Sequence, residues 1–208
     1  MRSFFVLINL ALISCCSTLS GIDNDFPKNW SPVKTSGGLC ADISGYYENK
    51  GAASYVPSGG AQYLHYRFDL EPQFPLLDTE HDVIRLQCID EKSVLVTQIR
   101  SGVHIATRDL VLSVEGYQLA NNALTFPERR ESGADGTGGY TVGIDFDLLV
   151  SDDGSLIGRQ HQVGVGAVLW LVPMAGAQTF WFKWSRAENP TDKTMQPAIV
   201  DGDLPGRR

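Results

Sequence analysis

The sequence has no apolar run after residue 14 that is long enough to cross a membrane as a helix, which needs about 20 apolar residues. It has no excess of positive charge either, because 24 acidic residues outnumber 17 lysines and arginines and give a net charge of −7. Nucleic acid and anionic membrane surfaces are therefore not expected as partners. The sequence also has no C-x-x-C or Cys/His pattern that would indicate a zinc site.

The first residues have the organisation of a secretory signal. Arg2 supplies one positive charge, and residues 4–13 are apolar except for Asn9. The run ends in Leu12-Ile13-Ser14-Cys15: an aliphatic residue, a tolerant position, a small residue and a cysteine. This segment resembles the lipobox of bacterial lipoproteins. The resemblance implies that the Cys15 thiol receives a diacylglycerol, and that the chain is then cut before Cys15 and acylated on its new amino group.

The resemblance covers about 15 residues and predicts a cell-envelope location. An ordinary cleaved signal without lipid is the alternative, although no A-x-A-like cleavage site is visible. In well-studied sorting systems an aspartate after the lipidated cysteine retains the protein in the inner membrane. That position is Cys16 here, so the resemblance favours the outer membrane, with the protein facing the periplasm or the cell surface. Two or three acyl chains on one cysteine give essentially permanent membrane anchoring.

The remaining cysteines are Cys16, Cys40 and Cys88. Export would place them in an oxidising compartment, where disulfides persist. Cys40 and Cys88 are the candidate pair, because Cys16 would lie beside the membrane. In the alternative, Cys88 is a reduced, buried strand residue.

Composition divides the chain into four parts. Residues 1–14 are the predicted signal peptide, and residues 15–38, rich in Ser, Asn, Pro and Gly, predict a lipidated flexible tether. Residues 188–208 contain three prolines and predict a disordered tail. The β domain is then residues 39–187.

Alternation of apolar and polar residues predicts an all-β domain. It is clearest over residues 140–150, and no 3.6-residue period follows the signal. Residues 64–70 also alternate, which predicts a strand with His65 pointing outward. Residues 163–172 are apolar on both faces and predict a central, covered strand. We expect an antiparallel meander that forms a β-barrel or half-barrel, with a β-sandwich as the alternative.

The segment Ile43-Ser44-Gly45-Tyr46-Tyr47 resembles the Gly-x-aromatic entry strand of lipocalin-type barrels. The resemblance is confined to these few residues. It implies a first barrel strand at this position and nothing about a ligand.

No motif identifies a catalytic residue, a metal ligand or a cofactor. Residues 78–82 (Asp-Thr-Glu-His-Asp) could hold a cation but are expected to form a solvated turn. The glycine-rich residues 133–139 predict a long flexible hairpin loop rather than an anion cradle. Asp145 and Asp147 share one strand face, which is expected to be the wet face of a sheet. The four histidines are expected to be solvated and without partners at ligand spacing.

The aromatic residues late in the domain are the remaining candidates for a ligand site. Trp170 and Trp181 could line a cavity for a lipid, glycan or peptide, whereas the alternative is that this cluster packs the core. The sequence therefore predicts a lipid-anchored binding or accessory module for a partner or a small apolar or glycan ligand. Two alternatives remain open: a periplasm-facing hydrolase and a structural component of an envelope assembly.

Overall fold

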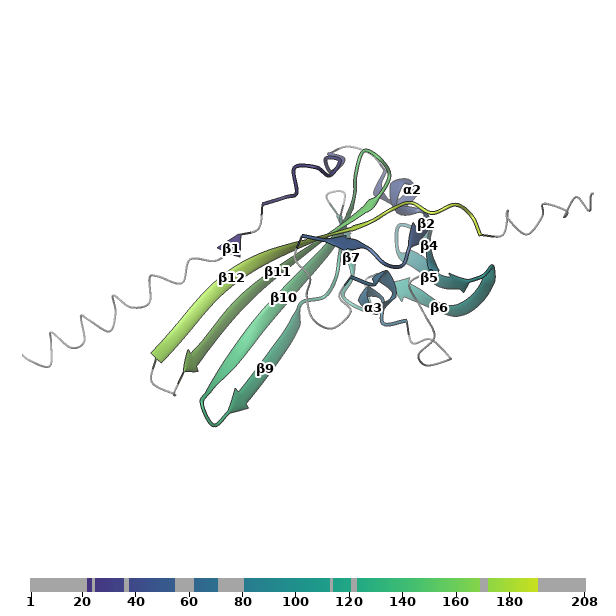
Figure 1. The fold of residues 1–208 in the computed structure, drawn as a ribbon. Helices are drawn as coiled ribbons and strands as arrows, with labels where there is room; N and C mark the ends of the chain where they lie inside the picture. The colour runs from purple at the N-terminus through teal and green to yellow at the C-terminus, as the bar shows by residue number, and fades with distance from the viewer. Residues whose placement is uncertain are drawn as a thin grey trace, which may run out of the picture.

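The computed structural model describes residues 22–23, 25–35, 38–54, 62–70, 81–112, 114–120, 123–168 and 172–190. Nearly all regular structure in these residues is β (Figure 1), so the all-β prediction is confirmed. In the same residues no helix is both long enough and apolar enough to cross a membrane. The predicted signal peptide, Cys15, Trp170 and most of the predicted tail lie outside the described residues.

The strands form two sheets. The smaller sheet has the order β2-β4-β5-β6, with bounds Gly45–Glu48, Val83–Asp90, Ser93–Arg100 and Val103–Val111. The eight-stranded sheet has the order β1-β12-β11-β10-β8-β7, with β3 paired to β12 and β9 to β10. Its bounds are Ile22–Asp23 (β1), Ala52–Ala53 (β3), Gln118–Ala120 (β7), Ala123–Thr125 (β8), Arg129–Asp135 (β9), Gly138–Val150 (β10), Leu156–Val168 (β11) and Val172–Trp184 (β12). Two helical turns complete the fold: α2 (Leu39–Ile43) and α3 (Leu64–Arg67).

The two sheets meet along one edge only. Tyr47 in β2 and Arg186, just after β12, form an isolated antiparallel bridge, and the Glu48 amide donates to the Ser185 carbonyl at 3.0 Å. At the opposite edge β6 pairs only with β5 in the part of the chain that the structure describes. The sheets therefore do not close into the favoured barrel, and the architecture is consistent with the alternative, a sandwich.

The core lies between the sheets and follows the period-two pattern of both. Every second residue of β10 from Phe146 onward is buried, as the alternation over residues 140–150 predicts. The larger sheet contributes Phe146, Leu148, Val150, Leu156, Phe180, Phe182 and Trp184 to this core. The smaller sheet contributes Ile84, Leu86, Val94, Val96 and Leu110.

The strands of the two sheets differ in length. Strands β10, β11 and β12 each have 13 residues, whereas β4, β5 and β6 have 8, 8 and 9. At about 3.3 Å per residue, the long strands exceed the short ones by about 13–17 Å. The excess extends beyond the smaller sheet together with β9 (Figure 1). We call residues 129–144, 161–168 and 172–178 the arm.

The prediction of a strand over residues 64–70 is wrong. These residues form α3 and the turn that follows it. Leu64 and Phe68, four positions apart, are both fully buried, which is a helical spacing. His65 is also buried instead of pointing outward. Its backbone amide donates to Asn49 Oδ1 at 2.9 Å, and its Nδ1 lies 2.9 Å from the same oxygen. These two contacts with the Asn49 side chain hold His65 inside the protein, although the alternation of residues 64–70 favours a strand.

Arg67, the last residue of α3, inserts between the sheets. Its guanidinium lies 4.4 Å from the Phe146 ring centroid and 4.5 Å from that of Phe182, and its Nη1 donates to Gln160 Oε1 at 2.8 Å. Burial lowers the pKa of Arg67 to about 10, so the group remains charged at neutral pH. Cation–π contacts with these two rings stabilise the charge inside the core.

The described part of the predicted tether lies against the β domain. Strand β1 pairs in parallel with β12, and the Phe26 ring packs edge-on against Trp181 with centroids 5.1 Å apart. Further along, Val33 forms a bridge with Ser151 in the turn between β10 and β11. The chain therefore follows the larger sheet for much of the segment before residue 38.

Cys40 in α2 and Cys88 in β4 form a disulfide, the pair that the sequence offered as a candidate. Their Cα atoms lie 5.4 Å apart, and the bond ties α2 to the smaller sheet. The two cysteines are 48 positions apart, so the bridge removes the freedom of a long loop from the unfolded chain.

We predict that the double variant Cys40→Ala/Cys88→Ala lowers the free energy of unfolding by about 4 kcal/mol, because the unfolded chain regains the entropy of this loop. Urea denaturation monitored by tryptophan fluorescence measures the loss. Cys16→Ala is the control and should leave the denaturation midpoint unchanged. Equal midpoints for the double variant and the wild type would contradict the prediction.

Candidate functional site

Within the arm, charged side chains are confined to the edge strand β9, which carries Arg129, Arg130, Glu131 and Asp135. Residues 136–144 and 162–178 include no Asp, Glu, Lys, Arg or His, in a chain in which 20% of residues are charged. Large apolar side chains are nevertheless exposed on the arm: Tyr140 (55%), Val163 (49%), Val165 (58%) and Met174 (40%). Contiguous exposed apolar surface of this kind marks interaction sites in soluble proteins.

Both faces of the arm are apolar. The strand register places Tyr140 and Met174 on the face that continues the core, and Val163 and Val165 on the opposite face. The sequence predicted a central, covered strand over residues 163–172. The described part of this segment belongs to β11, which is a central strand of its sheet. Val163 and Val165 are nevertheless exposed to solvent, so the prediction that the strand is covered is wrong. Both side chains point away from the smaller sheet, and both are exposed in the described structure.

A groove of about 570 Å³ runs across the core-side face of the arm. Gly133, Gly166 and Gly176 form part of its floor, and Tyr140 and Met174 are among the side chains beside them. The Tyr140 ring lies over Gly133, where an added Cβ would be 2.7 Å from the ring. The absence of side chains at the glycines thus creates the hollow, and its volume is in the range of small-molecule sites.

The glycine-rich residues 133–139 form a tight hairpin and not the long loop that the sequence predicted. They lie in β9, in β10 and in the two-residue connection Gly136-Thr137 between them. Asp135 Oδ1 accepts hydrogen bonds from the amides of Thr137 (2.7 Å) and Gly138 (3.0 Å). Aspartate side chains commonly stabilise turns in this way, so the run is ordered by its own carboxylate.

The predicted aromatic ligand site is not assembled in the described residues. Trp181 is half-buried on the outer face of β12, beneath Phe26, and Trp170 lies outside the described residues. Phe182 and Trp184 stack in the core with ring centroids 5.8 Å apart. Phe180, Phe182 and Trp184 therefore pack the interior, as the alternative interpretation expected, whereas Trp181 lies on the outer face, and the groove lies elsewhere.

The acidic segment over residues 78–82 is described only at His81 and Asp82. The buried Asp82 carboxylate accepts hydrogen bonds from Gln98 Nε2 at 2.6 Å and from Arg100 Nε at 2.7 Å. These bonds fix the start of β4 against β5. Among the described residues no group of three His, Cys, Asp or Glu side chains could hold a metal ion.

His65 belongs to the same buried polar cluster as Asp82. The backbone amide of Asn49 donates to the backbone carbonyl of Asp82 at 3.0 Å, and the side chain of Asn49 contacts His65. Burial lowers the pKa of His65 below its ordinary value, with the charge of Asp82 opposing this shift and that of Arg100 adding to it. His65 is therefore neutral at pH 7 in the folded protein.

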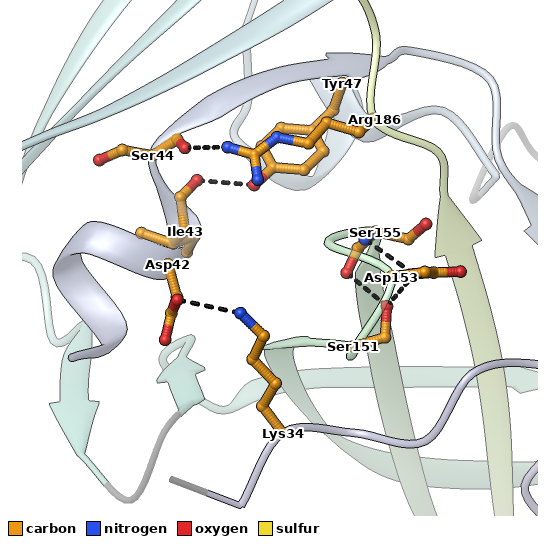
Figure 2. Close-up of polar contacts among 9 residues, drawn as sticks. All are labelled: Lys34, Asp42, Ile43, Ser44, Tyr47, Ser151, Asp153, Ser155 and Arg186. Carbon is orange, nitrogen blue, oxygen red and sulfur yellow. Dashed lines mark hydrogen bonds and ion pairs between the residues drawn. The ribbon is translucent and has the colours of Figure 1, made fainter. Parts of the chain in front are cut away.

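A second set of polar contacts closes the end of the sandwich next to α2 (Figure 2). Arg186 Nη2 donates to the Ser44 carbonyl at 2.6 Å, and its guanidinium lies 5.8 Å from the Tyr47 ring centroid. A Cβ at Gly45 would lie 2.5 Å from Arg186 Nη2, so glycine is required for this approach. Burial raises the pKa of Tyr47 to about 12, and its hydroxyl donates to the Ile43 carbonyl at 2.9 Å.

In the turn between β10 and β11, Ser151 contacts Asp153 (Figure 2), and Lys183 of β12 binds the same aspartate. Ser151 Oγ donates to Asp153 Oδ1 at 2.5 Å, and Lys183 Nζ donates to Asp153 Oδ2 at 2.7 Å. Desolvation disfavours the charged carboxylate, but the hydrogen bonds from Lys183 and Ser151 outweigh it and lower the pKa of Asp153. Ser151 is fully buried, so this arrangement stabilises the turn.

Asp145 and Asp147 lie on the outer, polar face of the larger sheet, as the sequence predicted, but the sequence did not predict their partners on the neighbouring strands. Asp145, His161 and Thr179 lie opposite one another on β10, β11 and β12, and His161 Nδ1 lies 3.1 Å from Thr179 Oγ1. Strand register, which the sequence alone does not show, brings them together. On the same face Asp147 pairs with Arg159 at 2.5 Å. These polar residues lie away from the groove, so the residues of the hydrolase alternative do not line a cavity there.

We predict that the free energy of unfolding falls as the pH is lowered from 7.5 to 5.5, partly because of His65. The unfolded chain binds a proton at His65 near pH 6.5, whereas in the folded chain burial disfavours the protonated imidazole. Uptake of one proton on unfolding lowers the free energy of unfolding by at most about 1.4 kcal/mol for each pH unit. Urea denaturation at several pH values should show a flatter pH dependence for His65→Gln. His104→Gln, at an exposed site on β6, is the control, and an unchanged slope in His65→Gln would contradict the prediction.

The groove is thus the candidate site for a ligand, and the polar clusters serve the fold. Its lining is mainly apolar, and Asp135 at the hairpin turn is the one acidic or basic residue among the described residues that line it. Comparison of the chain with models of protein families, with curated proteins and with solved structures finds no match.

Proposed function

We propose that this protein is an exported, lipid-anchored module of the bacterial cell envelope that binds an apolar ligand in the groove of the arm. The observation that carries the proposal is an apolar groove on a part of the sheet that nothing in the described chain covers. An apolar ligand would remove Tyr140 and Met174 from water, which is favourable in proportion to the area buried.

The lining favours an apolar ligand over a glycan. Glycines and the apolar side chains of Tyr140, Val142 and Met174 dominate it, whereas sugar hydroxyls need several polar partners at fixed positions. Thr137 and Asp135 are polar, but both are engaged in the hairpin turn, where the Thr137 hydroxyl donates to Asp135 Oδ1 at 2.6 Å. A groove with this lining is suited to binding an apolar ligand without converting it chemically.

Two features support the anchor and the envelope location. The Leu12-Ile13-Ser14-Cys15 sequence supplies the lipid site by its resemblance to a lipobox. The disulfide between Cys40 and Cys88 suits an oxidising compartment outside the cytoplasm. Outer-membrane sorting follows from Cys16, which occupies the position where an aspartate would retain the protein in the inner membrane.

We predict that Cys15→Ala abolishes incorporation of radiolabelled palmitate when the protein is expressed in a bacterial host, because the only thiol at the lipobox position is lost. Cys16→Ala is the matched control and should keep the label. Immunoprecipitation followed by autoradiography measures it. Label that persists in Cys15→Ala would mean that Cys15 is not the lipid site.

We predict that Gly176→Glu weakens binding of the neutral fluorescent probe N-phenyl-1-naphthylamine by about tenfold or more, because a carboxylate in the groove would be desolvated. An added Cβ at Gly176 meets nothing within 4 Å, so the fold should tolerate the change. The mature chain, exported through a signal without the lipobox, allows fluorescence titration without detergent.

Gly38→Glu is the control for this titration. A Cβ at Gly38 also meets nothing within 4 Å, and Gly38 lies outside the groove. Its affinity for the probe should equal that of the wild type. If Gly176→Glu binds the probe as tightly as the wild type, the groove is not the binding site. Equal urea denaturation midpoints for the wild type and both variants establish that all three proteins are folded.

A further inference from the structure

We infer that the apolar ligand of the arm is the lipid of the anchoring membrane, and that the arm lies in the interfacial layer of that membrane. The inference rests on the proposed lipid anchor at Cys15. It assigns the groove and the opposite face of the arm to one occupant, phospholipid, and it fixes which end of the molecule faces the membrane.

The first observation is the direction of the N-terminal segment. Val33 lies at the turn after β10, Phe26 contacts Trp181, and Ile22 pairs with Gln178. Followed backwards, the chain therefore moves along β12 from the core toward the arm. Because β1 is parallel to β12, the chain enters β1 at Ile22 from the side of the free end of the arm.

The second observation is the length of the connection. Cys15 lies seven positions before Ile22, and an extended chain of that length spans at most about 25 Å. Val172, at the free end of β12, lies six positions before Gln178, a distance of about 20 Å along a strand. A lipidated Cys15 at the bilayer surface therefore keeps the arm close to that surface, with the smaller sheet on the side away from the arm.

The third observation is the surface of the arm. Val163 and Val165 are exposed on one face and Tyr140 and Met174 on the other, so a membrane that covered a single face would leave the second in water. Entry into the interfacial layer covers both. Tyrosine is enriched at that depth, because its ring is apolar and its hydroxyl can reach water.

The edges of the arm limit the depth of entry. Two edges of the arm have no strand partner in the described chain: the edge of β9 away from β10, and the edge of β12 away from β11 at residues 172–177. Unpaired backbone groups are not tolerated in the hydrocarbon core. Asp135 keeps a carboxylate at the β9–β10 turn. Both features place the arm among the headgroups and the adjoining acyl segments, where water can still satisfy these groups.

The test uses the lipidated full-length mature protein in vesicles of radiolabelled phosphatidylcholine. Val165 and Met174, one on each face of the arm, are replaced in separate variants by the photoreactive p-benzoylphenylalanine. Val103 on β6 receives the same group as the control, because it is as exposed as Val165 (63% against 58%) but belongs to the smaller sheet. After flotation and illumination, the lipid label on the protein is counted.

We expect several-fold more lipid label at positions 165 and 174 than at position 103. Label at position 103 that equals or exceeds that at the arm would overturn the inference, as would crosslinking of the arm mainly to a second copy of the protein. Proteins that do not float would contradict the anchor itself, and the inference with it. Flotation with no lipid label at the arm would contradict the inference alone.

Discussion

The difference in strand length between the two sheets is the constraint on which the rest of the structure depends. Face-to-face packing requires apolar side chains from both sheets, and β4, β5 and β6 supply them over only part of the 13-residue strands of the larger sheet. Where the sheets overlap, alternation, the Arg67 contacts and the disulfide produce an ordinary core. Beyond the overlap, the same three strands continue with no opposing layer, and their apolar residues become surface.

The polar chemistry of the molecule is concentrated in the overlapping part and serves its stability. Asp82, His65 and Arg186 are held by partners within the fold, and Asp153 closes a turn. The arm has the opposite character on β10, β11 and β12, where its residues are small or apolar and none is Asp, Glu, Lys or Arg, and its charged side chains are confined to the edge strand β9. The polar side chains of the overlapping part are thus engaged in structural hydrogen bonds, whereas the arm combines a cavity with exposed apolar side chains.

The sequence was a good guide where local pattern and tertiary environment agree. The alternation over residues 140–150 predicted β10, and the composition predicted an all-β fold of antiparallel strands. It was a poor guide where a tertiary contact decides the outcome. His65 is held inward by Asn49 within a helical turn, and Asp145 meets His161 only through strand register. Likewise, nothing in residues 163–172 indicates whether a second layer covers them.

By itself, the sequence determined the class of the fold, the candidate pair Cys40 and Cys88, and the apolar, uncharged character of the later strands, because these follow from composition and period. It also supplied the resemblance to a lipobox from which the proposed anchor at Cys15 derives. Only the tertiary structure decided that the sheets stay open, that the aromatic residues fill the core and that the groove lies on the arm. Those features depend on which strands pair and how far two sheets overlap, and both are set by contacts between residues far apart in the chain.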